Sequence, residues 1–173
     1  MLLVKRNPSA RFMPGVWVFP GGAVDDADAG GDDESRHRVC AIRELAEEAG
    51  IELDAGAELI PFSRWITPEP VPIRFDTRFY LALAPPHSPP RPDGRETVDA
   101  AWFEPARALS RHREGDLDLV FPTIKNLEVL TRFETSEEAM DATRNADVEP
   151  ILPRVVGDGG DRRVVLPGEA GYE

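Results

Sequence analysis

The stretch "RELAEEAGI", from Arg43 to Ile51, is the feature that most constrains the fold of this chain. Successive residues of an α-helix lie about 100° apart, so Glu44, Glu47 and Glu48 fall on one face of a helix. Apolar residues fall opposite, and we expect that stripe to face the core while the carboxylates lie on the other side. The expected stripe consists of Val39, Ile42, Leu45, Ala46 and Ala49.

Three carboxylates this close to one another have two interpretations. They repel, which should raise one or more of their pKa values or reduce stability, and a hard cation such as Mg²⁺ or Mn²⁺ would relieve the repulsion. Alternatively, they are ordinary solvated glutamates on an exposed helix face. The helix by itself leaves both interpretations open.

The surrounding residues favour the metal site. "RELAEEAGI" matches the pattern R-E-U-x-E-E-x-G-U, where U is aliphatic, at every specified position, and "FPGG" (Phe19 to Gly22) follows an apolar segment. Both are parts of the Nudix box, so the chain resembles the Nudix hydrolase family over at least Leu2 to Phe133. The resemblance implies an α+β fold, an α/β/α sandwich around a mixed β-sheet. It also implies an enzyme that cleaves a diphosphate linkage with a divalent metal ion and water.

The resemblance also implies roles for the residues of the box. Glu47 and Glu48 correspond to metal ligands, and Glu44 corresponds to a ligand or the general base. Arg43 corresponds to the residue that orients Glu44 through a charge-assisted hydrogen bond. The metal ion would be Mg²⁺ or Mn²⁺, with a further ligand from a backbone carbonyl. The carbonyl is that of Gly21 or Gly22.

The box departs from the family pattern in its loop. The segment from Gly22 to Arg43 is about seven residues longer than usual, and the extra residues lie in "AVDDADAGGDDES". The position that normally carries a glutamate is Ser35, and Glu34 is one residue out of register. Either that glutamate is dispensable, or Glu34 supplies it. The acids of the loop either bind another cation or form a solvated loop and a helix N-terminus. They are Asp25, Asp26, Asp28, Asp32 and Asp33.

The segment from Leu2 to Gly22 is similar to the signature that precedes the box in the coenzyme A diphosphatase branch of the family. Val4 replaces a threonine of that signature, and Asn7 replaces a small residue. Arg6 and Arg11 would then bind substrate phosphate, since coenzyme A carries a ribose phosphate besides its diphosphate. The alternative is that both arginines flank a strand end and pair with acids.

A second segment, "WITPEPVPIRFDTRFY", resembles a branch of Nudix coenzyme A hydrolases with a lengthened box. In a strand, Arg74, Asp76 and Arg78 would share one face. Arg74 and Arg78 are therefore candidates for binding phosphate, and an Arg-Asp-Arg ion network is the alternative.

A late acidic residue serves as a base or an extra metal ligand in many Nudix enzymes. Glu96 is our catalytic candidate for that role, and Asp99 is the alternative. Cys40 lies near the acidic helix face, where carboxylates would raise its pKa, so we expect a packing residue and no nucleophile.

The order of predicted elements does not alternate regularly, which favours an α+β fold over a doubly wound sheet. We expect a Nudix domain over residues 1–133 and an extension over 134–173, which contains a hairpin. That hairpin would cover a sheet edge in its own subunit or in a partner, so a homodimer is possible.

The sequence also predicts the individual elements. Expected strands span 2–6, 16–19, 58–65, 75–84 and the segment "TVDAAWFEP". Expected helices span 33–50, 105–113 and 122–133, and a further helix is capped by Ser136.

Composition limits the possible partners. The net charge of -12 disfavours nucleic acid and anionic membranes, although bridging cations permit a phosphorylated substrate. A single cysteine suits a reducing cytoplasm, and no apolar run approaches the roughly 20 residues that span a bilayer. We therefore expect a cytoplasmic protein with a small-molecule diphosphate substrate, no nucleic acid partner and no membrane partner.

Three functions remain open at this point. The first is a hydrolase of coenzyme A or acyl-coenzyme A, and the second is a hydrolase of ADP-ribose or another nucleotide. The third is a Nudix-shaped ligand-sensing module without catalysis. Because Glu44, Glu47 and Glu48 are all present, we favour an enzyme.

Overall fold

The computed structural model describes residues 1–54, 56–157, 160 and 162–172. Its helices are α1 (Asp33–Ala49), α2 (Pro105–Arg113), α3 (Phe121–Leu130) and α4 (Ser136–Thr143). Its strands are β1 (Leu2–Arg6), β2 (Trp17–Val18), β3 (Ile60–Ile66), β4 (Asp76–Leu81), β5 (Thr97–Trp102), β6 (Pro150–Ile151), β7 (Arg154–Val156) and β8 (Arg163–Val165). In the described part of the chain, no helix has the length and apolar character needed to cross a membrane.

The chain divides into two compact units. The first contains Met1–Leu59 and Ala82–Ala139, and the second contains Ile60–Leu81 and Met140–Glu173. The first unit holds the complete predicted Nudix box. The domain boundary that we expect after residue 133 stays a prediction.

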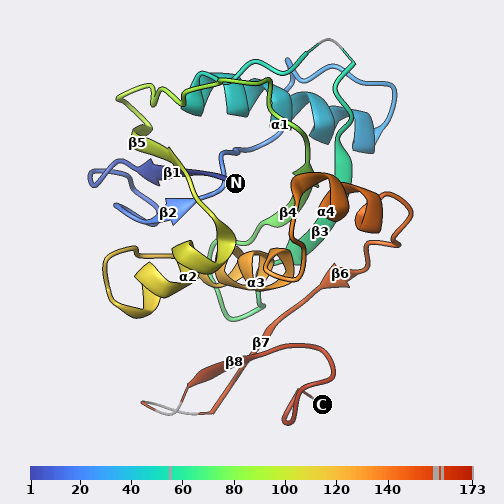
Figure 1. Cartoon of the computed structure of the whole chain (residues 1–173). Helices are drawn as coiled ribbons and strands as arrows, with labels where there is room; N and C mark the ends of the chain where they lie inside the picture. The colour runs from blue at the N-terminus through green and yellow to red at the C-terminus, as the bar shows by residue number, and fades with distance from the viewer. Residues whose placement is uncertain (55, 158–159, 161, 173) are drawn as a thin grey trace. The chain divides into compact units, whose positions relative to one another are not determined.

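The first unit is built on an antiparallel sheet with the strand order β2-β1-β5. Side chains alternate between the two faces of a strand, so Leu2 and Val4 of β1 lie on one face and Leu3 lies on the other. Leu2 and Val4 pack with Ala49 of α1, whereas Leu3 packs with residues of α2 and α3. Figure 1 shows the sheet between these two helical layers. The first unit is thus the α/β/α sandwich that the box implies.

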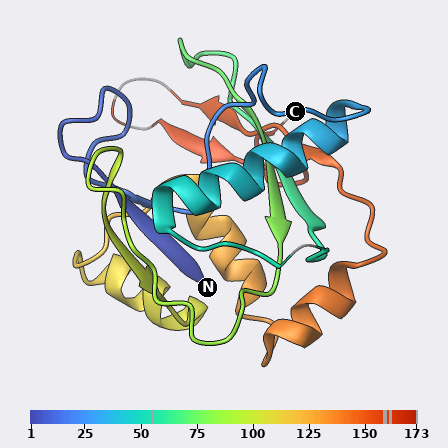
Figure 2. The same ribbon diagram turned by 90° about the horizontal axis from the view of Figure 1, so that it is seen from above.

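Helix α1 has clear start and stop signals. The Asp32 side chain accepts a hydrogen bond from the Ser35 N–H (2.7 Å) and caps the N-terminus. Gly50 adopts a left-handed conformation (φ 62°) after the last turn, and its N–H donates to the Ala46 carbonyl (3.0 Å). The helix therefore spans the predicted residues to within one position, and Figure 2 shows it as one continuous teal helix.

The prediction of which face of α1 is buried is wrong in part. Val39 and Ile42 are 38% and 39% exposed, although we expected them in the core stripe. Glu44 and Glu48 are only 9% and 4% exposed. The reason is that the chain after β2 passes beside α1 and covers its carboxylate face. Helical periodicity groups the acids correctly but does not reveal what covers them.

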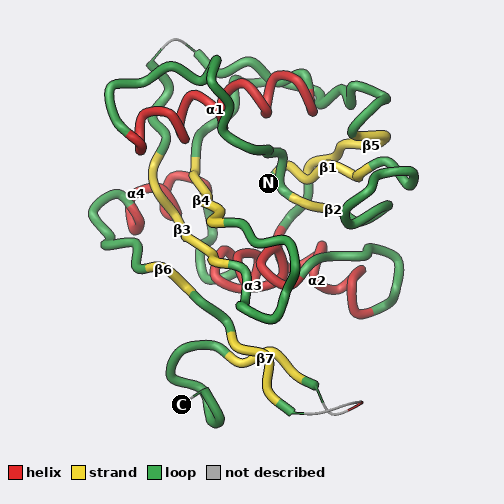
Figure 3. Tube along the Cα trace, turned by 180° about the vertical axis from the view of Figure 1, so that it is seen from behind, coloured by secondary structure: helices red, strands yellow, loops and turns green. Residues whose placement is uncertain are grey.

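The second unit contains a mixed sheet with the order β4-β3-β6, in which β3 pairs antiparallel with β4 and parallel with β6. The predicted C-terminal hairpin is present as β7 and β8, which form a two-stranded antiparallel ribbon (Figure 3). In the described residues, β6, which lies in the first apolar piece of the predicted hairpin segment, lies along an edge of β3. The edge is thus covered within this chain, and a homodimer stays a prediction.

Several predicted boundaries differ from the structure. Strand β2 is shorter than residues 16–19, β3 runs from Ile60 to Ile66 and β4 from Asp76 to Leu81. Helix α3 begins at Phe121, so Pro122 is not its first residue. At the start of α4, the Thr135 hydroxyl accepts the Glu138 N–H (3.1 Å), so Thr135 and not Ser136 supplies the cap.

Candidate metal and diphosphate site

The glycine turn after β2 lies directly against the carboxylates of α1. The Gly21 N–H donates a hydrogen bond to Glu48 Oε2 (2.9 Å). A Cβ atom on Gly22 would lie 2.2 Å from Glu44 Oε1, which is well inside contact distance. Only a residue without a side chain therefore lets the backbone approach Glu44 this closely.

Burial changes the acidity of the two inward-facing glutamates. Burial raises the pKa of Glu48 to about 7; the Gly21 N–H opposes this effect, and the negative charge of Glu44 adds to it. Burial also raises the pKa of Glu44, against the opposing influence of Arg43. The predicted rise in pKa is present in Glu44 and Glu48, but its main cause is burial, and repulsion between the carboxylates contributes less. A bound cation would favour the ionised forms of both groups.

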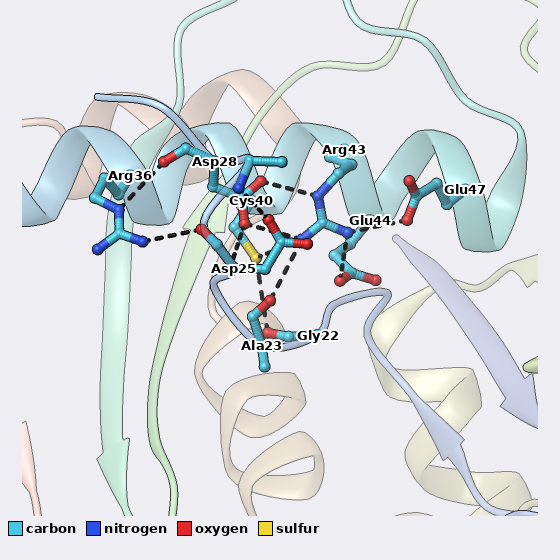
Figure 4. Close-up of polar contacts among 10 residues, drawn as sticks. Gly22, Ala23, Asp25, Asp28, Arg36, Cys40, Arg43, Glu44 and Glu47 are labelled. Carbon is cyan, nitrogen blue, oxygen red and sulfur yellow. Dashed lines mark hydrogen bonds and ion pairs between the residues drawn. The ribbon is translucent and has the colours of Figure 1, made fainter.

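Arg43 connects the carboxylates of the site (Figure 4). Its Nη1 donates to Glu44 Oε1 (2.8 Å) and to Glu47 Oε2 (3.0 Å). Its Nε and Nη2 donate to the two oxygens of Asp28 (2.8 and 2.9 Å). Arg43 therefore makes the contact with Glu44 that the Nudix resemblance implies, and Asp28 is the third carboxylate that it contacts.

Asp28 is the residue of this site that sequence reasoning missed. We expected either a solvated loop acid or a ligand of another cation, but the residue has no exposed surface. Its hydrogen bonds with Arg43, together with the Asp25 N–H, hold its pKa well below the ordinary value. Glu34, which is one of two alternatives for the shifted box glutamate, accepts a hydrogen bond from Arg38 Nε (3.0 Å). The available sequence signal was the density of acids in the inserted segment, which does not identify one of them.

Glu96 lies in a tight turn that is fastened to α1. One oxygen of Asp93 accepts the N–H groups of Arg95 (3.1 Å), Glu96 (3.0 Å) and Thr97 (2.8 Å). The Thr97 hydroxyl donates to the Glu48 carbonyl (2.6 Å). The negative charge of Glu96 contributes to the raised pKa values of the buried glutamates on α1. The structure thus brings Glu96 to the carboxylate cluster, whereas the Asp99 carboxylate accepts its neighbour's N–H (2.8 Å).

A cavity of about 340 Å³ adjoins this turn. Arg6 acts electrostatically on Glu48, where it opposes the rise in pKa, so the cavity lies close to the carboxylates. The Asn7 side chain donates to the Arg95 carbonyl (2.8 Å) and joins the two loops that form the walls. Three arginines and one glutamate are among the lining residues. The lining residues are Arg6, Asn7, Ser9, Ala10, Arg11, Arg95 and Glu96.

The other two candidate arginines, Arg74 and Arg78, lie in the second unit. Arg74 precedes β4, and its Nε donates to the Thr67 carbonyl (3.0 Å). Asp76 accepts two hydrogen bonds from Arg64 of β3 (2.8 and 2.6 Å). An ion pair between Arg64 and Asp76 therefore exists on this sheet. A role for Arg74 and Arg78 in binding phosphate stays a prediction.

Cys40 lies beneath the inserted loop. Burial, followed by the negative charges of Asp28 and Glu44, raises the pKa of its thiol to about 11. At neutral pH the thiol is therefore protonated and weakly nucleophilic, in agreement with a packing residue.

The donor set fits a hard divalent cation only in part. Glu44 and Glu48 are buried carboxylates, and oxygen ligands of this kind suit Mg²⁺ and Mn²⁺. Across residues 1–54, 56–157, 160 and 162–172, however, no three His, Cys, Asp or Glu side chains are grouped closely enough to hold a metal ion. Backbone carbonyls of the glycine turn and oxygens of the substrate would have to complete the coordination shell.

Comparisons with known proteins point to one family. The family model described as "NUDIX domain" matches residues 1–121. "Putative nudix hydrolase 7" of Caenorhabditis elegans is 28% identical over 209 aligned positions, which cover 99% of this chain and 69% of that protein. The human acyl-coenzyme A diphosphatase NUDT19 is 23% identical over 77% of this chain and 60% of its own length.

A solved structure supports the same assignment. The crystal structure of a NUDIX hydrolase from Alicyclobacillus acidocaldarius matches with a TM-score of 0.71 and 29% identity, over 84% of this chain and 89% of that chain. This match confirms the predicted Nudix fold. Nudix hydrolases use divalent metal ions and act on small-molecule substrates. The chain belongs to the Nudix hydrolase family, and it is a pyrophosphohydrolase.

Proposed function

We propose that this protein hydrolyses the diphosphate linkage of coenzyme A or an acyl-coenzyme A. The observation that carries the proposal is the arginine-lined cavity beside the buried glutamates of α1. Coenzyme A has a diphosphate for the carboxylate site and a separate ribose phosphate for the arginines. The acyl-coenzyme A diphosphatase activity in the name of the human relative supports the same substrate class.

In this proposal, Glu44, Glu47 and Glu48 would supply carboxylate ligands to a divalent cation, Mg²⁺ or Mn²⁺, and substrate oxygens would complete its coordination shell. The carbonyl of Gly21 or Gly22 supplies a further ligand. Such a cation, when bound, neutralises diphosphate charge and makes bound water more acidic. The net negative charge of the three glutamates and Arg43 would attract such a cation, which would favour the ionised forms of the buried carboxylates.

The other roles in the reaction belong to side chains of the protein. Arg43 orients Glu44 and Glu47 through its Nη1. Glu44 or Glu96 accepts a proton from the attacking water, whose oxygen bonds to one phosphorus atom while the P–O–P linkage breaks. The leaving phosphate departs with the electron pair of the broken bond. Arg6 and Arg11 bind the ribose phosphate, and Arg95 contributes a third positive charge to the same cavity.

A hydrolysis screen tests the substrate class. Coenzyme A, dephospho-coenzyme A, ADP-ribose, NADH and nucleoside triphosphates are compared with Mg²⁺ and with Mn²⁺, and products are identified by mass. We expect the highest kcat/KM with coenzyme A or its acyl derivatives, and a lower value with dephospho-coenzyme A, which lacks the ribose phosphate. A preference for ADP-ribose, or equal rates with and without the ribose phosphate, would contradict the proposal.

A further inference from the structure

The inserted loop of the Nudix box has a defined structure held by two arginines of α1. Arg36 donates from Nη2 to the Asp25 carbonyl (2.9 Å) and from Nε to the Asp28 carbonyl (3.2 Å). The Asp25 N–H donates to Asp28 Oδ2 (2.9 Å). Arg43 donates from Nη2 to the Ala23 carbonyl (3.3 Å). These contacts fold the loop back onto the helix and place one carboxylate, that of Asp28, beneath it (Figure 4).

The geometry of Arg43 divides its donors between two tasks. Nε and Nη2 form a two-point pair with the Asp28 carboxylate, which fixes the plane and direction of the guanidinium group. Nη1 is left to face Glu44 and Glu47. Without the Asp28 carboxylate, the guanidinium could rotate and place additional donors on those glutamates.

The charges lead to the same conclusion. The Asp28 side chain is buried and that of Arg43 is 25% exposed, so water weakens this ion pair less than it weakens a pair on the open surface. The Asp28 carboxylate balances the positive charge of Arg43, and the negative charge of Glu44 and Glu47 then remains available to a cation. If Asp28 were neutral, Arg43 would instead be balanced by those glutamates, and their attraction for a divalent cation would fall.

We propose that Asp28, contributed by the insertion, positions Arg43 and through it Glu44 and Glu47, in place of the glutamate that the lengthened box has lost from its usual register. The proposal rests on the metal-binding role assigned to these glutamates, but it does not depend on the identity of the substrate. Asp28 acts through Arg43 and is a positioning residue. Glu34, which pairs with Arg38, is not required for this function.

Three isosteric variants test the proposal: Asp28→Asn, Glu34→Gln and, as the matched control on the same loop, the exposed Asp26→Asn. Each is assayed with whichever diphosphate the wild-type protein hydrolyses best, so an incorrect substrate proposal does not affect the result. For Asp28→Asn we expect kcat to fall about 10- to 100-fold with KM changed less than about threefold. Mn²⁺ affinity without substrate, measured by calorimetry, should fall as well. The other two variants should stay within about twofold of wild type, and Asp28→Glu should recover part of the lost kcat.

A loss of kcat in Glu34→Gln together with normal kcat in Asp28→Asn would overturn the proposal. The proposal would also be overturned if Asp28→Asn lowered kcat without changing Mn²⁺ affinity and Asp28→Glu had a kcat no higher than that of Asp28→Asn. Should Asp28→Asn fail to fold, Arg36→Gln takes its place, because it loosens the loop and leaves the Asp28 carboxylate intact.

Labelling of Cys40, the only cysteine in the sequence, reports opening of the loop in the metal-free protein. In Arg36→Gln we expect faster labelling together with a lower kcat. Faster labelling with unchanged kcat would show that the loop is only a cover, and the positioning role would be rejected.

Discussion

Two loops lie beside the carboxylates of α1, and their charged residues differ in whether they are paired within the chain. In the inserted loop, the buried carboxylate of Asp28 is paired with Arg43, and its backbone carbonyl is bonded to Arg36. In the loops around Arg6 and Arg95, arginine residues line an open cavity. Charges that are satisfied inside the chain can position other side chains. Charges directed into a cavity are available to a ligand.

The comparison separates acceleration of the reaction from recognition of the substrate. Changes on the insertion side should reduce kcat, because they disturb the reacting geometry. Changes on the cavity side should raise KM for substrates that carry an extra phosphate. The following variants test that division, beginning with the carboxylates that both loops adjoin.

Glu48→Gln should have the largest effect. We expect kcat/KM to fall at least about 100-fold, because a neutral amide is a poor ligand for a hard cation. The amide oxygen can still accept the Gly21 N–H, so the thermal unfolding midpoint should be close to that of wild type. Glu52→Gln, an exposed residue four positions later, is the control. Normal activity in Glu48→Gln would remove the basis for the metal site.

Gly22→Ala should have the second-largest effect. The new methyl group would lie 2.2 Å from Glu44 Oε1, so the Glu44 side chain must move away from its place beside Arg43. We expect a kcat loss of roughly tenfold and about 1 kcal/mol of stability, measured by steady-state kinetics and denaturant unfolding. Gly31→Ala, in the same loop but with open space around it, should change neither quantity. Equal effects of the two substitutions would refute the importance of the close approach.

Arg95→Gln should raise KM for coenzyme A about tenfold and leave kcat nearly unchanged, because one charge-assisted contact to the ribose phosphate is lost. KM for dephospho-coenzyme A should not change. Arg91→Gln, a nearby arginine outside the cavity lining, is the control. If KM rises equally for the two substrates, the cavity does not recognise the ribose phosphate.

The smallest expected effect is a pH dependence of stability in protein treated with a chelator. The folded-state pKa of Glu48, about 7, is higher than its ordinary value of 4.5. The stability contributed by this group is therefore complete below about pH 4.5 and is lost as pH rises to about 7. Thermal unfolding over this range should show a falling midpoint that is less steep in Glu48→Gln. Parallel curves for the two proteins would show that Glu48 is not the responsible group.

Local sequence patterns predicted most elements of the first unit. Glycine and aspartate at its ends define α1, and the run Leu2, Leu3, Val4 behaves as a strand covered on both faces. The spacing of the glutamates also predicted that Glu44 and Glu48 lie together. These features depend on residues that are near one another in the chain.

The remainder depends on contacts that no local pattern encodes. The buried face of α1 is decided by the glycine turn, which approaches Glu44 only because the fold brings β2 beside the helix. Asp28 lies fifteen residues before Arg43, in an insertion that changes the usual spacing of the box residues. Five acids of that insertion are equivalent in the sequence, and tertiary structure makes only Asp28 the partner of Arg43.

The turn at Asp93 has a consequence for the evolution of this enzyme. Its carboxylate fixes the backbone up to Thr97, and the Arg91 N–H donates to the Ala49 carbonyl (2.7 Å) at the end of α1. Hydrogen bonds therefore hold the chain in a fixed position beside α1 from Arg91 to Thr97. Insertions or deletions between Pro85 and Pro90 should leave Glu96 in place. A change of length in that proline-rich segment would thus alter the surface of the enzyme and leave the backbone around Glu96 held by the same hydrogen bonds.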